Sequence, residues 1–155
     1  MKEANAFFGT NGADDAAKEV LNALTALAHQ AQLEIGGYIN KMTTRSGMVY
    51  YQYTKPMVGE RKSVSLPVTY QIGYHTHPYI DPINGLRFSH KGTSWLNGGT
   101  GGDAEWVRVA NNHLYVGAMA GNDVAGAVKI GICEYKSTCE TGLAYKGNPP
   151  TRIIQ

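Results

Sequence analysis

The sequence predicts an α/β domain in which helices pack against a mixed, largely antiparallel sheet. Apolar residues first recur at helical spacing across residues 14–31, and short segments rich in β-branched and aromatic residues follow, separated by Gly, Pro, Ser or charged turns. With 155 residues, of which 43% are hydrophobic, the chain is long enough for one compact core. We expect residues 1–12 to form a flexible leader and residues 13–155 to form a single domain.

The expected first helix spans residues 14–31 and is amphipathic. Asp14 and Asp15 suit the N-terminus of a helix, where carboxylates interact favourably with the helix dipole. His29 lies near the C-terminal end of this helix, where a positively charged imidazolium would also interact favourably with the helix dipole. The apolar stripe predicts a face packed on a sheet and consists of Ala17, Val20, Leu21, Leu24, Leu27, Ala28 and Ala31.

The strands are expected after this helix. Four of them are predicted before the middle of the chain, at residues 33–40, 48–53, 63–68 and 69–75. A second helix is expected at residues 103–111, followed by strands at 114–118 and 128–133, a turn at 121–123 and an irregular tail at 146–155.

Two histidines at the end of the fourth predicted strand are the main candidates for a functional site. His75 and His77 are separated by one residue, and strand side chains alternate between faces, so both imidazoles point to the same side. They can therefore reach one metal ion. A pair of strand histidines alone is a weak signal, because such pairs are more often solvated or hydrogen-bonded.

The set of motifs around these histidines resembles the JAB/JAMM metalloprotease-like superfamily. That family has a strand-borne Glu, then His-x-His-Pro, then Ser-x-x-Asp, and the matching segments here are Glu34 within residues 33–39, the run from Gly73 to Pro78, and Phe88-Ser89. The resemblance extends from residue 14 to residue 121. It is greatest to bacterial domains of unknown function at the C-terminal tips of Rhs-type polymorphic toxins.

The chain departs from the family pattern after Ser89, which has no acidic residue three positions on. The glycine-rich stretch that follows instead offers Thr100-x-x-Asp103, with residues 92–99 read as part of an insertion. The resemblance implies Asp103 as the third metal ligand, with Asp81 as a rival. A structural role is open for Asp103, since a carboxylate can also cap the predicted second helix.

The resemblance also implies a chemistry. A zinc ion held by His75, His77 and Asp103 would keep one position open for water, as catalytic zinc sites do. Glu34 would act as the base for that water, and Thr100 or Ser89 would donate a hydrogen bond to the oxyanion. The implied activity is that of a peptidase or isopeptidase acting on a protein or peptide substrate.

The biological setting implied by the resemblance is that of a toxin effector domain. It would be secreted or delivered into a target cell as part of a larger toxin, with a possible cognate immunity protein. The start of the chain shows no secretory signal peptide, and no segment is apolar enough for a membrane span, so no membrane association is expected. Any export signal would lie elsewhere on a larger polypeptide.

Two other functions are compatible with the sequence. One is a binding module that keeps the fold without the chemistry, which the missing Ser-x-x-Asp motif favours. The other is a toxin nuclease in which His75 and His77 act as acid and base. The formal charge is only +2 and no run of Lys or Arg is present, so nucleic acid is not the expected partner.

The two cysteines are compatible with two states. Cys133 and Cys139 flank a short polar link that could be a hairpin turn with a disulfide across its base, or they could be two thiols. A zinc site made of these cysteines is disfavoured, because no second Cys or His pair accompanies them.

Overall fold

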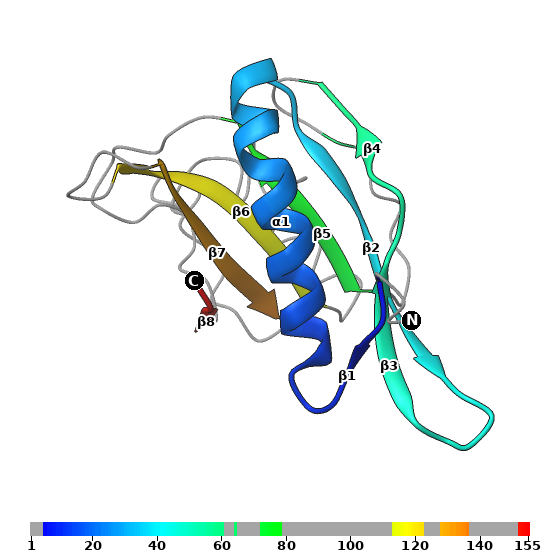
Figure 1. Cartoon of the computed structure of the whole chain (residues 1–155). Coiled ribbons are helices and arrows are strands. Elements are labelled where there is room, and N and C mark those ends of the chain that lie inside the picture. Colours follow the sequence, from blue (N-terminus) through cyan, green and yellow to red (C-terminus); the bar gives the residue numbers. More distant parts are fainter. Residues whose placement is uncertain (1–4, 61–63, 65–71, 79–112, 123–127, 137–151) are drawn as a thin grey trace.

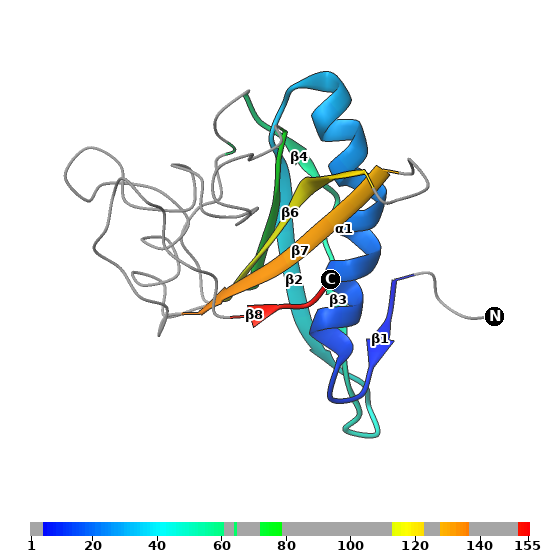
Figure 2. The same ribbon diagram turned by 90° about the vertical axis from the view of Figure 1, so that its left-hand side faces the viewer.

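The computed structural model describes residues 5–60, 64, 72–78, 113–122, 128–136 and 152–155. Within these residues, one helix lies along one face of a curved sheet, as the two perpendicular views show (Figures 1 and 2). The helix is α1 (Gly12–Ala31). The strands are β1 (Phe7–Phe8), β2 (Ile35–Thr43), β3 (Val49–Tyr53), β4 (Met57–Val58), β5 (Ile72–His77), β6 (His113–Asn122), β7 (Val128–Lys136) and β8 (Arg152–Ile153).

The sheet is mixed and largely antiparallel, which confirms the predicted class. Its strand order is β1-β3-β2-β5-β6-β7-β8, and β4 also pairs with β2. Among the described strands, β5 and β6 form the one parallel pair, with His75 opposite Val116 and His77 opposite Ala118. β2 and β5 therefore lie at the centre of the sheet, where both are paired on each side.

The helix covers one face of the sheet through its apolar stripe. The core on this side combines the helical residues Ala16, Ala17, Val20 and Leu21 with the strand residues Ile39, Tyr74, Tyr115 and Ile132. The predicted stripe is largely confirmed. Leu27 is nevertheless 53% exposed and Ala31 is exposed too, whereas Thr25, which was not predicted, is fully buried. The helical period places Thr25 and not Leu27 toward the sheet.

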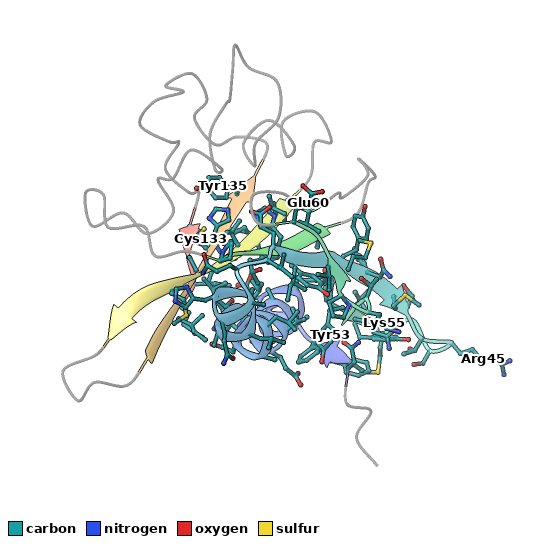
Figure 3. The ribbon with its side chains drawn as sticks, turned by 90° about the horizontal axis from the view of Figure 1, so that it is seen from above. Arg45, Tyr53, Lys55, Glu60, Cys133 and Tyr135 are labelled. Atoms are coloured by element: carbon teal, nitrogen blue, oxygen red, sulfur yellow. The ribbon has the colours of Figure 1, made fainter. Side chains whose placement is uncertain are left out.

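The opposite face of the sheet carries a second group of buried side chains. Its members lie on β6 and β7 and alternate with the residues that face the helix: Leu114, Val116, Ala118, Cys133 and Tyr135. Figure 3 shows Cys133 and Tyr135 on the side away from α1. Because His75 is directly opposite Val116, it shares this second face.

A charged cluster joins the start of the helix to the far edge of the sheet. The guanidinium of Arg152 on β8 donates two hydrogen bonds to Asp14, of 2.9 and 2.6 Å, and lies 3.1 Å from the buried carboxylate of Glu134. Tyr115 also donates to Asp14, at 2.6 Å. Burial alone would raise the pKa of Asp14, but the hydrogen bonds from Arg152 and Tyr115 hold it below its ordinary value.

Several elements differ from the sequence prediction. The expected flexible leader contains β1, which pairs with β3 through Phe7 opposite Tyr51. The expected irregular tail contains β8, and β4 was not predicted at all. Two-residue strands carry no recognisable alternation, so pattern analysis misses them.

Other expected elements extend further than predicted or lie outside the described residues. β5 continues to His77, and β6 continues through Asn122 into the expected turn. The predicted strand at 63–68, the helix at 103–111 and Cys139 fall outside the described residues, apart from position 64. The two states expected for Cys133 and Cys139, a disulfide or two thiols, therefore both remain predictions.

Candidate metal site

The structure brings together three of the residues that the sequence singles out. Glu34, His75 and His77 each offer a ligand atom, and these three atoms lie within 4.8 Å of one another. All three side chains are buried, with exposed fractions of 5%, 5% and 1%. Burying so many titratable groups together is costly unless they are paired or bind a cation, so the cluster is a strong candidate for a functional site.

The register of two central strands explains why the three residues meet. β2 and β5 are antiparallel, and Gly36 lies opposite His75. The same register continued by two positions places Glu34 opposite His77, with both side chains on the face away from α1. Across the other edge of β2, the amide of Glu34 donates to Glu60 at 2.8 Å and its carbonyl accepts from Gly59 at 2.7 Å.

Thr76, between the two histidines, ties the strands together from the opposite face. Its hydroxyl accepts a hydrogen bond from the amide of Ile35 at 3.0 Å and donates to the carbonyl of Ile35 at 3.4 Å. The side chain is fully buried. Because Ile35 follows Glu34 directly, Thr76 fixes the backbone that carries the carboxylate relative to the strand that carries both imidazoles.

Gly36 lies at a crowded position of β2 beside His75. A β-carbon at this position would lie 2.8 Å from the carbonyl oxygen of Tyr74, 3.0 Å from Cβ of His75 and 3.2 Å from Cγ1 of Val64. The first of these contacts is with backbone, which cannot move aside cheaply. The absence of a side chain at Gly36 therefore permits the close approach of β2 to β5 and of Val64 to the site.

The two imidazoles face each other through equivalent atoms. Nε2 of His75 lies 3.2 Å from Nε2 of His77, and the ring centroids are 5.1 Å apart. Two nitrogens bound to one tetrahedral zinc at the usual 2.0–2.1 Å would be about 3.3 Å apart. The observed separation thus fits two ligands of one metal ion with little movement.

The donor set also fits zinc by its chemistry. Imidazole nitrogens with a carboxylate oxygen are typical ligands of zinc, whereas calcium and magnesium prefer sites made of oxygen. His75 and His77 would hold the ion. The carboxylate of Glu34 lies close enough to bind it directly or to contact a water molecule on it.

The remaining residues predicted for the site lie outside the described residues. These are the expected third ligand and its rival, Asp103 and Asp81, and the expected oxyanion donors, Thr100 and Ser89. Their roles remain predictions. Val64 and Thr76 carry no motif that would predict a role at the site. Only the alternation of β5 indicates that Thr76 faces away from the histidines.

No protein-family model, curated protein or solved structure matches this chain. The likeness to JAMM-type proteins therefore rests on the motifs themselves. Within the described part of the chain, no helix is long and apolar enough to cross a membrane.

Proposed function

We propose that this chain is a zinc-dependent hydrolase of amide bonds, a peptidase or isopeptidase. The observation that carries the proposal is the convergence of Glu34, His75 and His77 in one buried cluster. A metal site made of two histidines and a carboxylate is common among hydrolytic zinc enzymes. The motif resemblance indicates the same reaction class.

The proposed mechanism assigns separate tasks to these residues. Bound zinc would lower the pKa of a water molecule toward neutrality and polarise the scissile carbonyl. His75 and His77 would hold the ion from the same face of β5. Glu34 would accept the proton of the attacking water and deliver it to the leaving nitrogen. Glu34 suits this task because it lies directly before the adjacent strand β2 and within reach of both imidazoles.

Three further residues complete the proposal from the sequence. Asp103 would be the third metal ligand, and Thr100 or Ser89 would donate a hydrogen bond to the oxyanion of the tetrahedral intermediate. Together with two histidines, Asp103 would leave one coordination position open, which a catalytic site requires.

Metal analysis tests this proposal directly. Protein purified without chelator should contain about one zinc per chain, and the double variant His75→Ala/His77→Ala should contain almost none. His113→Ala is the matched control, since this histidine lies at the far end of β6 beside Glu134. Equal zinc content in the double variant and the wild type would disprove the site.

The toxin setting is a separate proposal, and it rests on the motif resemblance. Produced in a bacterium without an immunity partner, the wild-type chain should impair growth, whereas Glu34→Gln should not, because an amide cannot accept the proton of the water. Equal toxicity of both proteins would exclude hydrolysis as the cause. Harmlessness of both in cytoplasm and periplasm would favour a binding module.

A further inference from the structure

The end of β5 is fastened to the end of α1 by two helix side chains. The carbonyl oxygen of Pro78, the residue directly after His77, lies 2.8 Å from Nδ1 of His29 and accepts a hydrogen bond of 2.8 Å from Nε2 of Gln32. A carbonyl oxygen can only accept, so Nδ1 of His29 carries its proton here. Both lone pairs of the Pro78 oxygen are thereby used.

Gln32 makes these contacts from an unfavourable backbone conformation. It has φ 56° and ψ 41°, the left-handed region, and is the one non-glycine residue with positive φ among the described residues. The backbone N–H of Gln32 donates a hydrogen bond to the carbonyl of His29 at 3.2 Å, and the backbone N–H of Leu33 donates one to the carbonyl of Ala28 at 3.1 Å. This is the hydrogen-bonding pattern of a Schellman motif, in which glycine is the usual residue at the position of Gln32.

A residue selected only to end the helix would be glycine, which adopts this conformation without the cost of about 1 kcal/mol that other residues bear. The side chain of Gln32 does what glycine cannot. Its side-chain amide donates hydrogen bonds of 2.7 Å to the carbonyl of His29 and 2.8 Å to the carbonyl of Pro78. It therefore joins the last turn of α1 to the end of β5. Retained strain of this kind is typical of residues that serve a site.

We propose that His29 and Gln32 are positioning residues for the metal site: through the Pro78 carbonyl they fix the backbone that carries His77. This inference rests on the proposed metal site. A proline cannot donate a backbone hydrogen bond, so the strand cannot extend its ladder through Pro78, and the helix side chains replace that restraint. Substitution of a residue that orients a metal ligand typically lowers the metal affinity by about 10- to 100-fold.

The substitution Gln32→Gly separates positioning from simple stabilisation. Zinc affinity of the full chain is measured by competition with a chromophoric chelator, and the melting temperature is measured on the metal-free protein. Gln32→Gly should bind zinc about 10-fold more weakly, while the metal-free protein melts at the wild-type temperature or above because the backbone strain is relieved. His29→Gln and Gln32→Glu provide second variants, and the exposed Gln30→Ala on the same turn should change neither quantity.

The outcomes are distinct for the two proposals. If the wild-type chain binds zinc and both Gln32→Gly and His29→Gln bind it equally well, the positioning role is overturned and the metal site stands. A loss of affinity that only mirrors a lower melting temperature also overturns the positioning role, because it shows plain stabilisation. If the wild-type chain itself binds no zinc, both proposals fail.

Discussion

Gly36 lies directly opposite His75 in the ladder between β2 and β5, and the missing side chain of the one makes room for the other. The neighbouring Gly37 is equally crowded, but by Thr54 and Tyr74 on the opposite face: a β-carbon there would lie 2.7 Å from the hydroxyl oxygens of both. A side chain at Gly36 would therefore disturb the site, whereas a side chain at Gly37 would disturb the core on the other face.

This pair of glycines gives the first prediction. Gly36→Ala and Gly37→Ala should each destabilise the chain by about 1–3 kcal/mol, because an added methyl group overpacks a closed space. Only Gly36→Ala should also weaken zinc binding, since it displaces the backbone beside His75. Chemical denaturation and zinc titration of the two variants provide the measurement. Equal zinc affinity in both would show that Gly36 does not shape the site.

The second prediction distinguishes the base from the ligands. Glu34→Gln should retain about one zinc per chain but lose cleavage of a mixed-sequence peptide library, scored by mass spectrometry, because the amide cannot accept a proton. Asp103→Ala should lose the zinc itself. Should Glu34→Gln lose zinc as well, Glu34 would be a metal ligand. Release of zinc by Asp81→Ala and not by Asp103→Ala would reassign the third ligand.

The third prediction concerns the hydroxyl between the two histidines. Thr76→Val keeps the shape of the side chain but leaves the buried amide of Ile35 without its acceptor, which should cost about 1–3 kcal/mol of unfolding free energy. Zinc affinity should fall too, because Ile35 carries the backbone next to Glu34.

Thr54→Val is the matched control for this experiment. The hydroxyl of Thr54 accepts a hydrogen bond of 2.9 Å from the amide of Tyr38, further along β2. Its loss should lower the unfolding free energy without changing zinc affinity. If the two variants bind zinc alike, Thr76 stabilises the sheet and does not position the site.

The fourth prediction is a pH dependence that arises at the helix N-terminus. The pKa of Asp14 is held below its ordinary value by the hydrogen bonds of Arg152 and Tyr115. A lowered pKa in the folded state contributes stability above the unfolded pKa of about 3.9, and this contribution is lost as the pH falls through the folded value. Asp14→Asn should therefore be less stable than the wild type at pH 7.

The difference between these two proteins should shrink as the pH is lowered below about 4. Denaturant titrations at neutral and acidic pH measure it. The exposed neighbour Asp15→Asn is the control, and it should show a much smaller difference at neutral pH. A constant difference between wild type and Asp14→Asn at all pH values would exclude the charge as its cause.

The elements with a long periodic pattern could be predicted from the sequence. Seven apolar positions at helical spacing identified α1 to within two residues at its start, and the alternation of residues 72–77 placed Tyr74 in the core and both histidines on the other face. Both inferences use only local geometry, which is fixed by the backbone period. The clustering of Glu34 with the histidines was predicted as well, although from motif resemblance.

The contacts that hold the site could not be predicted, because they join distant parts of the chain. Thr76 bonds to Ile35 across 41 positions, and Gln32 bonds to Pro78 across 46. No local pattern encodes such pairing, and His29 gave only the general expectation of an interaction with the helix dipole. The short edge strands β1 and β8 could not be predicted for the same reason, because only their pairing with distant strands makes them strands.

The parallel pairing of β5 with β6 has a consequence for how such a protein can change over evolution. The chain leaves β5 at His77, beside the proposed metal, and enters the adjacent parallel strand at His113, so residues 78–112 form a connection whose two ends are both held by the sheet. Ser89, Thr100 and Asp103 all belong to it. Closing a longer connection costs little additional free energy, so insertions there leave the strand register intact. The length of this connection can therefore change over evolution while Glu34 and the two histidines keep their places in the sheet.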